Sequence, residues 1–313
     1  MAATDPFPGQ WQPQLVLMAA LEVGLIAALA ERPRSEAEVV GELGLDERAT
    51  HRVVAALVDA GYLERRGDDI CLAPDVRALL DPADDAYVGD RLLHIHHLIA
   101  RWVQLPDVLR QGGPAPFERT PETLRAFIGS MHTGARDRAR PLADLLASLF
   151  PATKTVLDIG GGPATQAFAF QQHGWQVTVL DLPEVVELMA DELAEAGIAV
   201  IKADATEAIP AQGFDLVHCC NLFHSMSAQE CAAVVRGAAD ALASGGALSI
   251  YDFLRGEGLR SSLFAVNMLV ATSSGDVYAE EDYRHWCAAA GLRDFATREV
   301  PGESQRLLTA VKP

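Results

Sequence analysis

The C-terminal half of the chain alternates short apolar runs with segments of helical pattern, and this alternation constrains the fold more than any other feature. Near-continuous apolar runs separated by helical patterns are typical of a parallel sheet that helices cover on both faces. We therefore predict an α/β, Rossmann-like domain over residues 151–313. The runs are TVLDIG, QVTVLDL, AVIKADA, FDLVHCC and GALSIYDF, with QRLLTAV near the end of the chain.

The first of these runs leads directly into a glycine-rich turn, which reads D-I-G-G-G-P-A. Glycines at a strand-to-helix turn let the backbone bend tightly and approach a ligand closely. Such a turn is also found in NAD and FAD sites. Asp158, two residues before Gly160, disfavours a pyrophosphate at this position because like charges repel each other. A carboxylate suits the cationic amino-acid end of S-adenosylmethionine.

Two further acids follow the next two predicted strands. Asp181 ends the second strand, where it can accept hydrogen bonds from ribose hydroxyls, as in an NAD site. Asp204 ends the third strand, where it can meet the adenine amino group. Together these acids indicate one nucleoside, and we predict S-adenosylmethionine as cofactor and S-adenosylhomocysteine as product. The predicted cofactor-binding residues are Asp158, Gly160, Gly161, Gly162, Asp181, Leu182, Asp204, Ala205 and Asn221.

The first 85 residues predict a small, separate domain. Residues 15–30 read as one apolar helix, and Ser35 with Glu38 forms a capping-box pattern for a second. Asp46 is the expected N-cap of a third helix, and two short strands flank the turn at Gly67. Three helices followed by a hairpin make a winged-helix pattern.

Charge speaks against a DNA-binding role for this winged-helix pattern. Residues 35–69 hold four arginines and nine acidic residues, whereas a helix for the major groove is expected to be basic. The whole chain has a formal net charge of −18, which disfavours proteins that grip phosphate backbones. We expect a dimerisation module and no nucleic-acid partner.

The middle region, residues 86–150, predicts two helical segments joined by the loop GGPAPF. His94, His96 and His97 do not share one helical face, so we expect no metal site. Five cysteines without CxxC spacing favour a reducing compartment, and we expect a cytoplasmic protein.

The N-terminal segment MAATDPFPGQWQP lacks the features of a signal peptide. The apolar run that follows it is interrupted by Glu22 and is shorter than the ~20 residues of a membrane span. We therefore expect this run to be a buried helix and the protein to have no membrane partner.

The arrangement LDIGGG, LDLP, ADA, FDLVHCCNLFHSM and GGALSIYDF resembles the class I methyltransferases. More narrowly, the chain resembles small-molecule O-methyltransferases of the plant caffeate and bacterial polyketide-tailoring type. The resemblance extends over nearly the whole chain, including Trp102 with Leu105 and the segment Phe127–Met131. It implies a seven-stranded sheet with an antiparallel last strand and a homodimer that interlocks through the N-terminal domain. Where the family often has a further glycine, this chain has Pro163-Ala164.

The same resemblance implies a catalytic base. His224 falls on the family's histidine, which deprotonates the acceptor hydroxyl, and imidazole titrates near neutral pH. Asp252 aligns with one of the two acids that frame this histidine. Val277 occupies the other acid's position, and the neighbouring Asp276 is an alternative for that acid. Ser225-Met226 replaces the family's Asp-Trp.

The acceptor is expected to be a small aromatic or polyketide-like molecule, and several chemistries stay open. Proximity to the activated methyl group can suffice for methylation of N, S or C. Some relatives use the cofactor structurally in a hydroxylation or a rearrangement. A winged-helix regulator and an NAD-dependent oxidoreductase are disfavoured by the acidic helix and by the absence of a second nucleotide-binding half. The predicted acceptor-binding residues are Met131, His132, Asn267 and Met268.

Overall fold

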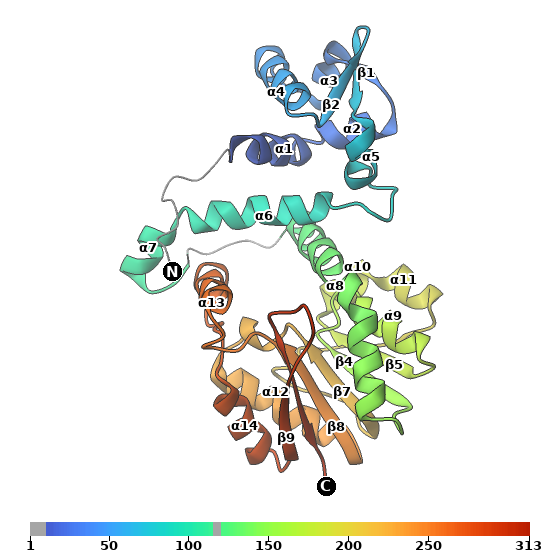
Figure 1. Cartoon of the computed structure of the whole chain (residues 1–313), viewed down its shortest axis with the longest axis vertical. Coiled ribbons are helices and arrows are strands. Elements are labelled where there is room, and N and C mark those ends of the chain that lie inside the picture. The colour runs from blue at the N-terminus through green and yellow to red at the C-terminus, as the bar shows by residue number, and fades with distance from the viewer. Residues whose placement is uncertain (1–10, 115–119) are drawn as a thin grey trace. The chain divides into compact units, whose positions relative to one another are not determined.

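The computed structural model describes residues 11–114 and 120–313, and these residues form two compact units (Figure 1). The first unit comprises residues up to Ile99 together with Arg125–Thr133, and the second comprises Ala100–Leu124 and Gly134–Pro313. Most of the segment MAATDPFPGQWQP and half of the predicted loop GGPAPF lie outside the described residues.

The first unit combines short helices with a three-stranded antiparallel sheet of order β1-β3-β2. The predicted capping box is confirmed, since the Ser35 side chain accepts a hydrogen bond from Glu38 N while Glu38 accepts one from Ser35 N. Asp46 caps α4 through Ala49 N, also as predicted. The elements are α1 (Gln12–Glu22), α2 (Leu25–Glu31), β1 (Arg34–Ser35), α3 (Glu36–Leu43), α4 (Glu47–Asp59), β2 (Leu63–Arg66), β3 (Asp69–Leu72), α5 (Pro74–Leu80) and most of α6 (Gly89–Trp102).

The prediction of one helix over residues 15–30 is wrong. Helix α1 ends at Glu22, and Gly24 adopts a left-handed conformation with φ of 78° before α2 begins. An α-helix cannot continue through such a residue, so the chain bends by 71° at this point. Both helices still bury their apolar side chains in the core of the first unit. In the part of the chain that the structure describes, no single helix is long and apolar enough to cross a membrane.

The second unit contains a seven-stranded sheet of order β6-β5-β4-β7-β8-β10-β9, which confirms the predicted fold class (Figure 1). Strands β4 to β8 are parallel, and β10 is antiparallel to both of its neighbours. The strands are β4 (Thr155–Ile159), β5 (Gln176–Asp181), β6 (Ala199–Lys202), β7 (Phe214–Cys220), β8 (Leu242–Asp252), β9 (Arg293–Glu299) and β10 (Arg306–Val311). The helices are α7 (Leu105–Gln111), α8 (Pro121–Leu149, shared with the first unit), α9 (Thr165–Gln172), α10 (Pro183–Leu188), α11 (Ala190–Glu195), α12 (Ala228–Ala241), α13 (Leu259–Ala271) and α14 (Glu280–Ala289), with a 3-10 turn η1 (Phe223–Ser225).

Helices cover both faces of this sheet. Helices α12 and α14 pack on one face through side chains such as Val234 and Tyr283. The C-terminal part of α8 and α9 pack on the other face through Leu142, Leu146 and Phe170. The apolar residues on both sides of each central strand explain why these strands read as continuous apolar runs.

Two boundaries differ from the sequence-based expectation. The family resemblance implies seven strands, but the apolar runs locate only six of them. They do not locate strand β9, because its sequence RDFATRE has no continuous apolar run, and pairing with β10 stabilises it at the edge of the sheet. Strand β6 ends at Lys202, so Asp204 lies in the following loop rather than at the end of the strand.

Strand β4 lies between β5 and β7. The chain adds β5 and β6 on one side of β4 and then continues with β7 on the other side, so the strand order reverses at β4. Open α/β sheets bind ligands at such a switch point, outside the carboxyl ends of the strands. The predicted site residues that follow β4, β5, β7 and β8 all lie at these ends.

Candidate active site

The turn after β4 contains three consecutive glycines, so its main chain carries no side chains. Gly160 and Gly162 have φ values of 68° and 52°, which side chains rarely tolerate, and Gly160 N donates a hydrogen bond of 2.8 Å to Leu180 O. A Cβ atom on Gly161 would lie 2.9 Å from Val179 Cγ1, so no side chain fits there. A ligand can therefore approach the main chain closely at this turn.

Asp181 joins the end of β5 to the glycine turn. Its Oδ2 atom accepts a hydrogen bond of 2.7 Å from Gly162 N, and its Oδ1 atom accepts one of 2.7 Å from Leu182 N. These two hydrogen bonds fix the Asp181 carboxylate beside the glycine turn.

Asp158 is 1% exposed, and neither of its carboxyl oxygens has a hydrogen-bond partner among the described residues. Burial, and secondarily the charge of Asp181, raise the pKa of Asp158 to about 7. An unpaired buried carboxyl is costly, so Asp158 is a candidate for contact with a ligand at the glycine turn.

Two more unpaired polar atoms lie near the carboxyl end of β7. Asn221 has a φ of 52°, and its Oδ1 atom is buried without a partner in the described part of the chain. The same is true of Nε of Arg138, whose guanidinium lies beside the Cys220 thiol and 5.6 Å from the centre of the Tyr251 ring. Arg138 is not among the residues predicted from the sequence, because a single arginine in an arginine-rich helix carries no signal of its own.

His224 and Asp252 form the closest side-chain pair of the site. Nδ1 of His224 lies 2.7 Å from Oδ1 of Asp252, and the backbone N of His224 lies 3.3 Å from Oδ2. The Asp252 side chain is fully buried, whereas the His224 side chain keeps 13% of its surface exposed. Because Oδ1 also accepts a hydrogen bond of 2.8 Å from Phe253 N, Asp252 holds the imidazole from a fixed position.

The 3-10 turn that carries His224 is itself firmly held. Phe223 is fully buried against Tyr283 and Trp286, and its carbonyl oxygen accepts a hydrogen bond from Cys231 Sγ. The Tyr278 hydroxyl donates a hydrogen bond of 2.6 Å to Met226 O. These contacts give the turn a rigid support beneath the imidazole.

The family resemblance implies a second acid beside His224, and the structure has an apolar residue at the position where it is expected. Val277 is 1% exposed and apolar, and Asp276 forms an ion pair of 2.8 Å with Arg255. Among the described residues, Asp252 is thus the carboxylate within hydrogen-bond distance of His224.

The remaining predicted residues are distributed more widely. Asp204 is exposed and accepts hydrogen bonds from Thr206 N and Oγ1 within its own loop, next to the half-buried Ala205. Oδ1 of Asn267 accepts a hydrogen bond of 2.9 Å from Trp102 Nε1, and Met268 is buried. Met131 and His132 lie on the part of α8 that belongs to the first unit. No group of three or more His, Cys, Asp or Glu side chains in residues 11–114 and 120–313 is arranged to hold a metal ion.

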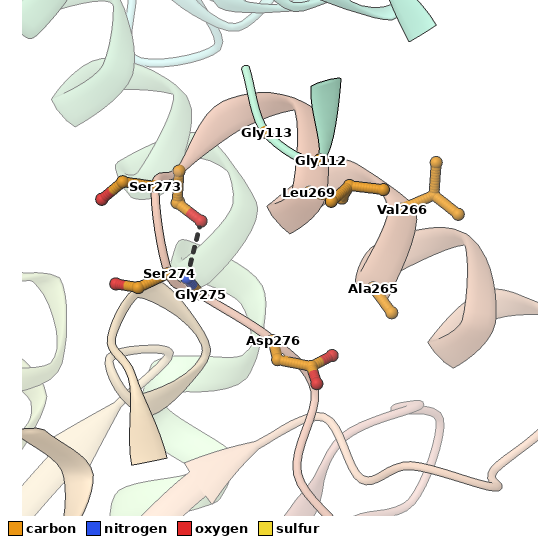
Figure 2. Close-up of a pocket in the computed structure, with 10 residues that line it drawn as sticks. Gly112, Gly113, Ala265, Val266, Leu269, Ser273, Ser274, Gly275 and Asp276 are labelled. Carbon is orange, nitrogen blue, oxygen red and sulfur yellow. Dashed lines mark hydrogen bonds between the residues drawn. The ribbon is translucent and has the colours of Figure 1, made fainter. Parts of the chain in front are cut away.

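A cavity of about 420 Å³ lies along α13. Figure 2 shows Ala265, Val266 and Leu269 on the helix and the segment from Ser273 to Asp276 around it. The segment also touches the active-site turn, since a Cβ atom on Gly275 would lie 2.3 Å from His224 O. His224 and Asp252 do not line this cavity, so we do not assign the acceptor to it.

Comparison with known proteins places this geometry in a family. Residues 135–296, more than half of the chain, match the family model described as methyltransferase domain. The chain is 28% identical to 3-hydroxy-5-methyl-1-naphthoate 3-O-methyltransferase of Streptomyces sahachiroi, over 94% of this chain and 90% of that protein. It is 27% identical to the tetracenomycin polyketide synthesis 8-O-methyl transferase TcmO of Streptomyces glaucescens, over 91% and 89% of the two chains.

Solved structures show the same fold. The structure described as PigF with SAH covers 96% of both chains, with a TM-score of 0.79 and 21% identity. Human N-acetylserotonin methyltransferase in complex with SAM covers 96% of this chain and 93% of its own, with a TM-score of 0.75 and 22% identity. On the match of the family model, this chain belongs to the methyltransferase-domain family.

Proposed function

We propose that the chain is an S-adenosylmethionine-dependent O-methyltransferase that methylates a hydroxyl group of a small aromatic or polyketide-like molecule. Family membership supports the reaction class, and the printed names of the relatives support the hydroxyl and the type of acceptor. The observation that carries the proposal is the His224–Asp252 pair at the carboxyl ends of β7 and β8, close to the glycine turn.

The residues of the turn fit the cofactor. The amino-acid end of S-adenosylmethionine is a zwitterion, and the unpaired buried atoms have the complementary charges and polarity. Asp158 and Oδ1 of Asn221 would accept hydrogen bonds from the ammonium, and Arg138 would bind the carboxylate. Gly160, Gly161 and Gly162 carry no side chains, so the main chain of the turn is open to the ligand.

Residues along the next loops would hold the nucleoside. We assign the ribose hydroxyls to Asp181, because its carboxylate lies at the end of β5 and is held beside the glycine turn by Gly162 N. Leu182, Asp204 and Ala205 would border the adenine. When bound, the cofactor supplies a methyl group already activated by the positive sulfonium.

The protein's part in the reaction is to orient the acceptor and remove its proton. A carboxylate only accepts hydrogen bonds, so the proton between His224 and Asp252 lies on Nδ1 and the lone pair of Nε2 is available. Nε2 would take the proton of the acceptor hydroxyl, and Asp252 would stabilise the imidazolium that forms. With the methyl group that the bound cofactor would supply, the acceptor would become a methyl ether and the cofactor S-adenosylhomocysteine. Such base catalysis contributes typically ~10²–10⁴-fold.

The test measures formation of S-adenosylhomocysteine from S-adenosylmethionine, with 3-hydroxy-5-methyl-1-naphthoate as the first acceptor and other hydroxylated aromatic acids and quinones after it. His224→Asn should lower the rate about 100-fold or more, because it removes the base. His285→Asn is the matched control, since His285 is exposed on α14 and should leave the rate unchanged. If His224→Asn retained full activity, proximity alone would drive the transfer.

We also propose a homodimer that interlocks through the N-terminal domain. The family resemblance supports the dimer, and Val23, 45% exposed at the end of α1, is an N-terminal apolar position at which it can be tested. Sedimentation analysis should give twice the mass of the chain, and Val23→Glu should shift it toward the monomer. A monomer at micromolar concentration in the wild type would refute the dimer.

A further inference from the structure

An aromatic side chain from a different part of the chain contacts the His224 imidazole. The ring centroid of Phe264, on α13, lies 4.7 Å from that of His224, and the two ring planes are nearly perpendicular at 87°. Perpendicular aromatic pairs at this distance attract each other and restrict ring rotation. His224 is therefore held at two points, by the Asp252 carboxylate and by the Phe264 ring.

The two points are linked to each other. Phe264 stacks on Phe253 with centroids 4.0 Å apart and an interplanar angle of 25°. Phe253 follows Asp252 directly in the chain, and its backbone N donates the 2.8 Å hydrogen bond to the oxygen that also binds the imidazole. The four residues thus form a closed ring of contacts, one of them through the backbone N of Phe253, and a rotation of the imidazole disturbs a neighbour on either side.

Helix α13, which carries Phe264, is anchored along its length. Near its start, the Ser261 hydroxyl donates a hydrogen bond to Leu254 O, and further along Asn267 accepts one from Trp102 Nε1. After its end, Thr272 Oγ1 accepts a hydrogen bond of 2.9 Å from Gly275 N, drawn as the dashed line in Figure 2. The missing Cβ of Gly275 lets this segment lie against His224 O. Phe264 is thus presented by a fixed element.

We propose that Phe264 is a positioning residue for His224, and this inference rests on the base role proposed above for that histidine. It keeps Nδ1 directed at Asp252 and Nε2 directed away from it, toward the acceptor. Phe264 itself is only half-buried, so its contribution to the core is limited and its aromatic ring is the feature that matters. A leucine of similar size would keep most of the packing but lose the perpendicular ring contact.

The test follows the Nδ1–H proton of His224 by NMR in the full-length protein, identified by its absence in His224→Asn. In Phe264→Leu we expect this proton to exchange with solvent about two- to tenfold faster than in wild type, the range that one aromatic pair contributes. Phe264→Tyr keeps the ring and should keep the wild-type exchange rate. Calorimetric affinity for S-adenosylmethionine should stay within about twofold in both variants, because α13 carries none of the proposed cofactor residues.

Gly275→Ala supplies an independent variant, since it perturbs the same turn from its backbone side and should also speed the exchange. An unchanged exchange rate in Phe264→Leu would overturn the inference, as would an equal effect of leucine and tyrosine. Failure of the proposed base role is a separate result, namely methyl transfer that persists in His224→Asn. The exchange measurement needs no acceptor, so it reports on Phe264 in either case.

Discussion

Replacing Asp158 with asparagine should make the ligand-free protein more stable and prevent it from binding the cofactor. The wild-type carboxyl is buried and unpaired among the described residues, and burial raises its pKa from 3.8 to about 7. Because the pKa of this carboxyl is higher in the folded state than in the unfolded state, its contribution to the free energy of unfolding is fully present below pH 3.8 and is lost as the pH rises through about 7. At ~1.36 kcal/mol per pH unit, the loss reaches roughly 4 kcal/mol.

Asparagine has nearly the same shape and no charge, so it does not titrate in this range. The free energy of unfolding of Asp158→Asn, taken relative to that of wild type, should therefore rise by roughly 2–3 kcal/mol between pH 5 and pH 8. The buried amide leaves its own polar atoms unpaired, which costs ~1–3 kcal/mol at every pH. The net expectation is a variant that is more stable than wild type at pH 8 by about 1–3 kcal/mol.

The measurement is urea unfolding of the ligand-free protein at both pH values, followed by tryptophan fluorescence, together with calorimetric titration of S-adenosylmethionine. The matched control is Asp215→Asn. Asp215 accepts hydrogen bonds from Lys154 N and from Thr155 N and Oγ1, and those backbone hydrogen bonds keep the pKa of its carboxyl below 3.8 despite partial burial. The control should lose about 1–3 kcal/mol equally at pH 5 and pH 8, because its carboxylate is ionised throughout.

A stability difference between Asp158→Asn and wild type that does not grow with pH would refute the reasoning about burial. Retention of micromolar cofactor binding in that variant would refute the assignment of Asp158 to the ammonium. Titration of other buried groups does not confuse the result, since it is shared by both proteins and cancels in the difference.

The remaining predictions concern a buried base, the glycine turn and a helix cap. Burial lowers the pKa of His218 to about 3, so below pH 6.5 only the unfolded state binds a proton at this residue. In urea unfolding between pH 6.5 and pH 5, the free energy of unfolding of wild type should therefore fall by up to ~1.4 kcal/mol per pH unit relative to His218→Asn. A difference between the two proteins that does not change with pH would contradict this. Gly161→Ala would place its Cβ 3.2 Å from Asp158 Oδ2, and calorimetry should show at least about tenfold weaker binding of S-adenosylmethionine; unchanged affinity would mean that no ligand approaches this glycine. Ser35→Ala removes a side chain of the capping box on α3 and should lower the stability of the first unit by ~0.5–2 kcal/mol in thermal unfolding, without affecting cofactor binding.

Local features of the fold could be predicted from the sequence because their causes are local. The β-branched and apolar runs of the central strands predict buried parallel strands wherever they occur. The side chains of Ser35 and Asp46 cap helices through hydrogen bonds to residues three positions away. The glycine turn follows its strand directly, and the backbone angles it needs explain its composition. The glycine turn with Asp158, followed by Asp181 and Asp204 after the next two strands, was enough to suggest the cofactor.

Features that depend on neighbours distant in the chain were decided by the tertiary structure. Strand β9 exists because β10 pairs with it, and the break at Gly24 exists because both short helices reach one core only when the chain bends. Asp158 is unpaired because no described residue from any neighbouring element places a hydrogen-bond donor beside its carboxyl, and no local sequence pattern encodes this. Phe264 meets His224 across forty positions of sequence, through the packing of α13. Local propensity acts over a few residues, whereas the surroundings of a buried side chain come from every element that packs around it.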